Sequence, residues 1–368
     1  MPLWVGAGAG KSRFPALIFD SQQFFFNPAG NPGTSLPSFH WQLKITHMKN
    51  GYSLLLAAGI FCLPFTPLKA QDPEFSQFYA NSLYLNPALA GSKICPNIQT
   101  NYRQQWPGIS GTYATFAASY DQYAYKVKGG IGVTVVHDQA GQGTLNTTGV
   151  GVVYAPVIPL GHSASISVGF QAGWWQKAVN WGLLNFGDQI DPRGGFIFNT
   201  QETPGQVRVS SFDLGAGAMF SSRTFYAGVA THHILEQNES LLNGTSKLPR
   251  KYTAHAGGII PLGGRSNGET YISPNIMYRQ QGDFRRLDLG MYVKNNALVG
   301  GLWYRGRDAF IMLIGLDLDN GMRVGYSYDV TVSRLTNASA GAHEVSLGWM
   351  FKCKKPKKKY RLHVCPSF

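Results

Sequence analysis

The amino-acid sequence predicts an all-β fold, a transmembrane outer-membrane β-barrel of about 14 antiparallel strands with a short irregular N-terminal segment. Apolar and polar residues alternate across the last hairpin, residues 320–351, with the period of two that is typical of strands. Only 14% of the residues are charged, whereas 13% are aromatic and 44 are glycine, as expected of a membrane barrel. Residues 71–368 contain no apolar run of about 18 residues, so a transmembrane helix is not expected.

The last hairpin shows the alternation most clearly. Every second residue from Met322 to Val332 is apolar or aromatic, and the residues between them are polar, charged or glycine. After a loop around 334–341 the alternation resumes and ends at the aromatic Phe351. A soluble sheet would bury the apolar face, whereas a barrel would turn it to lipid and keep the polar face in its lumen.

The N-terminal part of the chain predicts processing. Residues 48–70 match a secretory signal peptide, with a basic start and an apolar run at 54–65 that is too short to span a bilayer. Cleavage after Ala70 would leave Gln71 as the first mature residue. Residues 1–47 precede this signal, so we interpret them as a non-native upstream extension, arising from a wrongly chosen start codon or an added sequence.

The mature chain divides into three parts. Residues 71–93 contain prolines and no sustained period, which predicts an irregular or briefly helical N-terminal segment. Residues 94–352 predict the barrel, without a linker or second domain. Residues 353–368 form a basic tail that we expect in the periplasm, and this tail carries much of the formal net charge of +13. The excess of basic residues therefore gives no indication of a nucleic-acid partner.

The expected strands lie between clusters of turn-forming residues. They span 97–105, 112–122, 129–137, 145–155, 163–176, 207–221, 224–232, 251–262, 269–280, 285–294, 296–304, 309–318, 322–333 and 342–351. An even number of strands places both ends of the mature chain on the same, periplasmic side. The short connections 221–223, 294–296 and 319–321 then lie in the periplasm, and the two longest, 177–206 and 233–250, lie outside.

No residue pattern points to an enzyme, and we expect no cofactor and no metal ion. His232 and His233 are adjacent, so in a strand their side chains would point to opposite faces and could not readily bind one ion. His255 falls on the polar face of its strand and is expected in the lumen. No spacing singles out a Ser–His pair on one face. The glycines at 129–132 lie inside a strand pattern and not in a phosphate-binding loop.

Two aromatic pairs fit the interfacial girdles of a barrel. Trp174 and Trp175 form one pair, and Trp303 and Tyr304 form the other. Tryptophan and tyrosine are enriched where the membrane meets water, so we expect these side chains at the membrane interface and not on a carbohydrate-binding platform.

The loop at 185–196 combines turn formers with two acids and ends in apolar residues. It fits a long surface loop organised by Asx turns. It fits equally well a folded loop that packs in the mouth of the barrel or contacts a partner. Composition alone leaves both interpretations open.

Short motifs spread over residues 71–351 form one ordered set. They are Gln-Phe-Tyr at 77–79, Asn-Pro-Ala-Leu-Ala-Gly-Ser at 86–92, Arg-Gln-Gln-Trp-Pro-Gly-Ile at 103–109, Asp-Gln-Ile-Asp-Pro at 188–192, Gly-Tyr-Ser-Tyr-Asp at 325–329 and His-Glu-Val-Ser-Leu at 343–347. In their order and spacing, these motifs resemble the PorP/SprF family of type IX secretion membrane proteins. Residues 1–47 fall outside the resemblance.

The resemblance implies a non-enzymatic outer-membrane barrel that works beside a large secreted, often adhesin-like, protein. The expected partners are this cargo, bound through its C-terminal domain, the secretion or gliding machinery of the periplasm and outer membrane, and outer-membrane lipid. The family brings no catalytic residues with it. The candidate partner-binding residues are Trp106, Asp188, Gln189, Asp191 and Pro192.

Two other functions remain open from the sequence. The lumen-facing residues are mixed and small, which also fits an outer-membrane channel or transporter for small solutes. A soluble β-sandwich would explain the alternation as well.

The cysteines suggest a bridge between the ends of the barrel. Cys95 precedes the first expected strand and Cys353 follows the last, and these strands are neighbours in a closed barrel. The periplasm oxidises thiols, and a disulfide needs Cα atoms within about 7 Å. We therefore expect Cys95 to pair with Cys353, with Cys365 on the tail as the competitor.

Overall fold

The computed structural model describes residues 71–109, 111–161, 163–191, 193–203, 205–241, 244–262, 270–332 and 340–353. The predicted upstream extension at 1–47, the predicted signal peptide at 48–70 and the basic tail beyond Cys353 lie outside the described residues.

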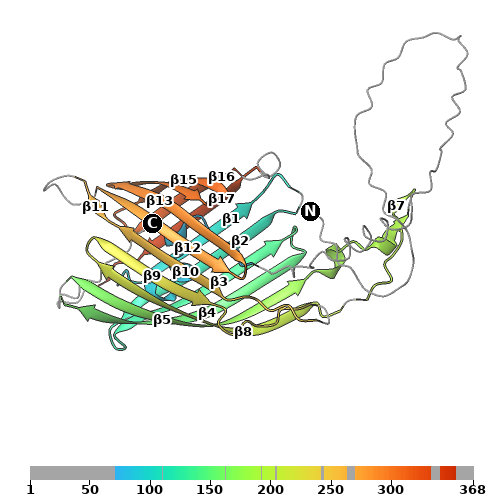
Figure 1. The fold of residues 1–368 in the computed structure, drawn as a ribbon, viewed down its shortest axis with the longest axis horizontal. Coiled ribbons are helices and arrows are strands. Elements are labelled where there is room, and N and C mark those ends of the chain that lie inside the picture. Colours follow the sequence, from blue (N-terminus) through green and yellow to red (C-terminus); the bar gives the residue numbers. More distant parts are fainter. Residues whose placement is uncertain are drawn as a thin grey trace, which may run out of the picture. The chain divides into compact units, whose positions relative to one another are not determined.

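Within the described part of the chain, 14 antiparallel strands form one closed barrel (Figure 1). They are β1 (Asn97–Gln105), β2 (Tyr113–Ala124), β3 (Gly129–Ala140), β4 (Leu145–Leu160), β5 (Ala164–Val179), β8 (Arg208–Ser222), β9 (Phe225–His232), β10 (Lys251–Gly258) continued by β11 (Ile260–Pro261), β12 (Tyr271–Gln281), β13 (Phe284–Asn295), β14 (Leu298–Arg305), β15 (Ala309–Asp317), β16 (Met322–Thr331) and β17 (Ala342–Met350).

Two pairings close the sheet on itself. β1 pairs with β17, with Asn97 opposite Met350, and β10 pairs with β12, with Lys251 opposite Gln281. Closure leaves no sheet edge, so the strands can satisfy their backbone groups inside a bilayer. The prediction of a closed antiparallel barrel with about 14 strands is confirmed.

The two faces of the wall follow the predicted alternation. Leucine, isoleucine, valine and aromatic side chains point outward, and Leu302 is 62% exposed. Polar and charged side chains point inward, and Glu344 is fully buried. This distribution matches a wall with lipid on its outside and a polar lumen. His255 lies on the inner face and is buried, as predicted.

The strand connections differ in length between the two ends of the barrel. Residues 180–207 and 233–250 form the long connections at one end, which we call the loop rim. At the other end β1 begins and β17 ends, and the turns 223–224 and 296–297 are short. We call this end the seam rim, because the first strand meets the last strand here through the pairing of Asn97 with Met350. The division agrees with the predicted sorting of connections.

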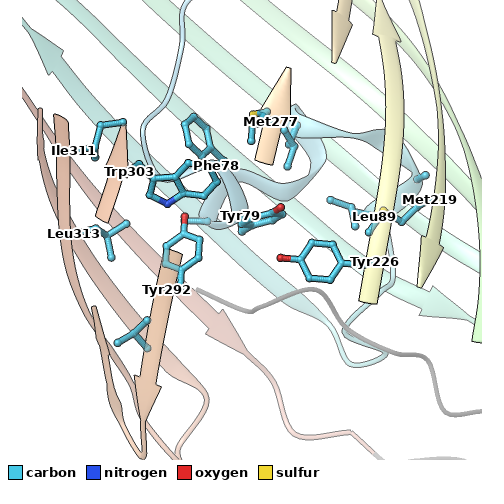
Figure 2. Packing of buried hydrophobic residues seen from close by; sticks show 14 residues of the cluster. Phe78, Tyr79, Leu89, Met219, Tyr226, Met277, Tyr292, Trp303, Ile311 and Leu313 are labelled. Carbon is cyan, nitrogen blue, oxygen red and sulfur yellow. The ribbon is translucent and has the colours of Figure 1, made fainter. Parts of the chain in front are cut away.

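The N-terminal segment, residues 71–93, lies inside the lumen. It forms three short helical turns, η1 (Phe78–Asn81), α2 (Ser82–Leu85) and η2 (Pro87–Leu89), which confirms the irregular, briefly helical prediction. Figure 2 shows Phe78 and Tyr79 of this segment enclosed by side chains of the wall. The ring of Phe78 packs edge-on against Trp303, with centroids 4.9 Å apart. The barrel core is therefore built between the segment and the wall.

The segment crosses the barrel from one rim to the other. Near the seam rim, the Gly91 amide donates to Asp121 Oδ2 at 2.8 Å. At the loop rim, the Asp72 amide donates to Gln281 Oε1 at 3.0 Å. The sequence predicted that both ends of the mature chain lie on one side. The ends of the described chain lie instead at opposite rims, because residues 71–93 run through the lumen.

The expected aromatic girdle is only half correct. Trp174 and Tyr304 point outward, but Trp303 is 2% exposed in the lumen and Trp175 packs against the buried residues Phe75, Ala117 and Val136. A period of two turns one member of each adjacent pair inward, so an adjacent pair cannot lie wholly in a girdle.

The prediction that the side chains of His232 and His233 point to opposite faces of a strand is wrong. β9 ends at His232, and His233 adopts a positive φ of 56°. The backbone therefore turns out of the strand alternation, and both side chains are buried.

Candidate functional site

The part of the N-terminal segment nearer the seam rim, which includes Asn86, Ala88 and Ala90, fits the wall by shape, and we call it the seam-rim half. A Cβ atom at Gly130 would lie 1.9 Å from Ala90 O, and a Cβ atom at Gly169 would lie 2.2 Å from Ala88 N. Only glycine allows the wall and the segment to approach this closely. Asn86 caps η2 by accepting from the Ala88 amide at 2.9 Å, and its side-chain amide reaches carbonyl oxygens of the wall.

Glu344 on β17 holds the middle of the segment. Its carboxylate accepts from the Ser76 amide at 2.6 Å and from the Gln77 amide at 3.2 Å. The Gln77 side chain donates to the Glu344 carbonyl at 2.9 Å and accepts from Ser346 Oγ at 2.6 Å. All of these groups are buried, so each bond offsets the cost of removing a polar group from water.

A buried charge cluster continues from this point toward the loop rim. Arg103 Nη2 and Arg305 Nη1 each lie 2.8 Å from Asp329 Oδ2. Ser76 Oγ donates to the same carboxylate oxygen at 2.7 Å. Arg103 also lies 3.5 Å from Glu344, so the two arginines, Asp329 and Glu344 form one buried ionic cluster beside the segment.

Asp72 binds a second group of wall residues at the loop rim. Its Oδ2 lies 2.8 Å from His233 Nε2 and 3.3 Å from Lys251 Nζ. His233 Nδ1 lies 3.1 Å from Asp213 Oδ2, so the imidazole bridges two carboxylates. Burial would lower the pKa of His233, but Asp72 and Asp213 outweigh it and raise this pKa to about 10. Burial opposes ionisation of Asp72, yet His233 and Lys251 lower its pKa well below its usual range.

Glu74 binds a third group. Arg279 Nη1 lies 3.5 Å from Glu74 Oε1, and the Arg286 guanidinium contacts the other oxygen. Asp288 lies between the two arginines, at 2.6 Å from Arg279 Nη2 and 3.1 Å from Arg286 Nε. Burial would raise the pKa of Glu74, but Arg279 and Arg286 lower it well below its usual range. The Arg279 guanidinium also stacks over the Phe78 ring, 4.7 Å from its centroid.

The predicted partner-binding acids organise the loop between β5 and β8. Asp188 Oδ2 accepts from the Gln201 amide at 2.7 Å. Asp191 Oδ1 accepts from the Arg193 and Gly194 amides, both at 2.7 Å, as in an Asx turn. Gln189 Oε1 accepts from the Phe186 amide at 2.8 Å. These side chains therefore shape the loop themselves, and Pro192 lies outside the described residues.

The same loop presents apolar side chains to its surroundings. β6 (Ile190–Asp191) and β7 (Gly195–Phe196) form a small two-stranded sheet within it. Phe196 is 62% exposed, Ile197 60% and Phe198 53%. Three consecutive large apolar side chains outside the barrel wall are typical of a contact surface.

Trp106 lies in another loop-rim connection. Its amide donates to Gly341 O at 2.9 Å, its φ is 56°, and its ring packs edge-on against Tyr113 at 5.7 Å. Among the described residues, no hydrogen bond or ring contact links Trp106 to Asp188, Gln189 or Asp191.

A disulfide joins Cys95 to Cys353 at the seam rim, with Cα atoms 5.5 Å apart. It lies beside the pairing of Asn97 with Met350. Cys365, the competitor in the sequence prediction, lies outside the described residues.

The residues that hold the lumen segment were largely missed from the sequence. Asp72, Glu74, Arg279, Arg305 and His233 carried no motif signal. One signal was available: in a chain with little charge, arginine and aspartate recur on the polar face of β12, β13 and β16. Charges that face a lumen need partners, and the acidic N-terminal segment supplies some of them.

In the described ranges, no helix is long and apolar enough to cross a membrane. The same ranges hold no group of three or more histidine, cysteine or acidic side chains arranged for a metal ion.

Comparison with known proteins identifies the family of the chain. The family model of the type IX secretion system membrane protein PorP/SprF matches residues 68–349. No curated protein matches the chain. Among solved structures, the chain is similar to the outer membrane protein Omp33 of Acinetobacter baumannii, with 10% identity, a TM-score of 0.40 and coverage of 70% of this chain and 98% of that one.

Two further solved barrels show a similar level of likeness. The toluene transporter TodX of P. putida has 10% identity and a TM-score of 0.42, with coverage of 74% of this chain and 95% of that one. The KdgM porin has 9% identity and a TM-score of 0.33, with coverage of 70% and 99%.

Proposed function

Since the chain belongs to the PorP/SprF family of type IX secretion system membrane proteins, we propose that it is a non-enzymatic outer-membrane barrel that assists secretion and surface anchoring of a large, adhesin-like cargo protein. Its partners are the C-terminal domain of this cargo and components of the secretion or gliding machinery. The observation that carries the proposal is the exposed apolar surface on the loop rim, formed by Phe196, Ile197 and Phe198.

This surface supports a role in protein contact. Large apolar side chains exposed to water are unfavourable unless a partner covers them. The acids of the motif at 188–192 act indirectly, because Asp188 and Asp191 hold the turns that present these side chains. The acids of the motif therefore shape the loop, and the apolar residues of the same loop make the contact with the partner.

The filled lumen favours this role over that of a solute channel. The N-terminal segment is buried along most of its length and contacts the wall through aromatic packing, hydrogen bonds and ion pairs. A channel needs an open path, so we place the channel function second.

The orientation follows from the lengths of the connections. In bacterial outer-membrane barrels, short turns face the periplasm and long loops face outward. The loop rim would then face the outside, where the cargo is anchored, and the seam rim with its disulfide would face the oxidising periplasm.

Site-specific photocrosslinking in intact cells tests the proposal. A photoreactive phenylalanine analogue at Phe196 or Phe198 should form an adduct with one large protein that carries a type IX C-terminal domain. The same analogue at Leu302, which faces lipid, should not. Adducts of equal amount and identity from both positions, or none from the loop, would contradict the proposed contact.

A further inference from the structure

The two halves of the N-terminal segment are held by different forces. The seam-rim half fits by shape at Gly130 and Gly169, and the adjoining disulfide of Cys95 fixes its base. The loop-rim half is held by charge, with Asp72 and Glu74 each bound to cationic side chains of the wall. Interactions of the second kind can be exchanged for equivalent ones from another chain, whereas a sterically matched and covalently fixed base cannot.

The wall of the loop-rim half is a receptor for carboxylates. Cationic side chains around the segment outnumber the wall carboxylates that pair with them. The cations are Arg103, Lys251, Arg279, Arg286, Arg305 and His233, and the carboxylates are Asp213, Asp288, Asp308, Asp329 and Glu344. The segment adds two further carboxylates, Asp72 and Glu74, to this set. In the described residues, the buried Nε atoms of Arg103, Arg279 and Arg305 have no hydrogen-bond partner.

The wall of the loop-rim half also contacts aromatic side chains of the segment. Phe78 lies under the Arg279 guanidinium, and Phe75 packs edge-on against Tyr84 with centroids 5.3 Å apart. Small cavities of about 20 Å³ each lie beside Asp72 and between Phe75 and Phe78.

From these contacts we propose that the loop-rim half of the lumen is a binding site for an acidic peptide, which residues 72–79 occupy in this structure. The ligand is a short segment with two carboxylates two residues apart, followed by aromatic residues. A partner chain with this pattern enters from the loop rim and takes the place of residues 72–79, while the seam-rim half stays docked. The site does not depend on the identity of the cargo or on the loop contact proposed above.

Peptide binding to the full-length barrel in detergent tests this site. The probe is a fluorescent octapeptide with the sequence of residues 72–79. In the wild-type protein the tethered segment competes at high effective concentration, so binding should be weak. In the variant Asp72→Asn/Glu74→Gln the tethered segment is weakened, and the peptide should bind at least tenfold more tightly. Adding Arg279→Gln and Arg286→Gln should abolish this gain.

Two controls make the result specific. A peptide with asparagine and glutamine in place of the two acids should not bind. The variant Lys294→Gln/Asp317→Asn removes an ion pair toward the seam rim, and it should bind the acidic peptide as weakly as the wild type does. The gel mobility of unheated samples reports folding, and Glu74→Gln alone replaces any double variant that does not fold. Equal binding of acidic and neutral peptides, or no gain over wild type, would overturn the proposal.

Discussion

Asp72 and His233 meet at the loop rim, with 2.8 Å between Oδ2 and Nε2, although they lie 161 residues apart in the chain. The imidazole is held on its other side by Asp213. This contact fixes the end of the N-terminal segment that lies opposite the disulfide. The segment is therefore attached at two points, by the Asp72–His233 ion pair at the loop rim and by the Cys95–Cys353 disulfide at the seam rim. One anchor responds to pH and the other to reductant.

The His233 anchor should weaken at alkaline pH. The pKa of His233 is raised to about 10 in the folded protein, against about 6.5 in an unfolded chain. Its contribution is therefore fully present below pH 6.5 and is lost as the pH rises through about 10. Hydrogen exchange at residues 71–77 should accelerate, beyond the intrinsic effect of base, between pH 7 and pH 10.

The control for this prediction is His233→Gln, which keeps a polar side chain but cannot titrate. Its corrected exchange rate should be raised already at pH 7 and should change little up to pH 10. The charged and titratable groups around His233 are Asp72, Asp213, Lys251 and His232. If the wild type and His233→Gln show the same pH profile, the imidazole does not control the anchor.

Adding a methyl group at Gly169 should expel the seam-rim half of the segment. The new Cβ would overlap the backbone of Ala88, and overpacking of this kind costs about 1–3 kcal/mol. Gly169→Ala should therefore expose residues 82–90 to protease, with a lower temperature for loss of the folded band on gels. Gly300→Ala is the matched control, because nothing lies within 4 Å of its added atom. Equal behaviour of the two variants would refute the close fit.

Current recordings in planar bilayers should separate the filled barrel from a channel. The wild-type protein should be silent, because residues 71–93 occupy the lumen. Deletion of residues 72–90 should produce discrete conductance steps, since the remaining wall is polar and charged on its inside. A wild-type conductance as large as that of the deletion variant would instead support the solute-channel function.

Thiol labelling should reveal the disulfide. Without reductant, fewer than three of the cysteines Cys95, Cys353 and Cys365 should react as free thiols in the folded protein. Cys95→Ser should raise the reactivity of Cys353 if these two are partners, and that of Cys365 if the tail competes. Freely reactive thiols at all three positions in the inserted protein would contradict the bridge.

The alternation of residues sufficed to predict the barrel wall. Each strand has a period of two, and this local signal fixes which side chains face outward and how many strands close the sheet. It cannot predict the interior. Ser76 and Glu344 bond to each other across 268 positions, and no local pattern connects them.

Local rules also failed where the backbone departs from the strand. His233 turns inward through a positive φ, so the assumption of opposite faces could not hold. Tryptophan is a residue type typical of a girdle, but the position of Trp303 in the alternation turns its side chain to the lumen. The sequence predicts that the acids at 188 and 191 bind a partner. The fold shows that they shape the loop while Phe196 and its neighbours are exposed.

The most direct measurement is a quantitative comparison of the secreted and surface proteins of a strain that lacks this gene with those of its parent. We expect one large protein with a type IX C-terminal domain to be lost from the surface, while other type IX cargo is unaffected. Complementation with wild type should restore it. Asp188→Ala/Asp191→Ala should restore it poorly, and lipid-facing Leu287→Val/Leu289→Val should restore it fully. An unchanged set of secreted and surface proteins in the deletion strain would contradict the proposed function.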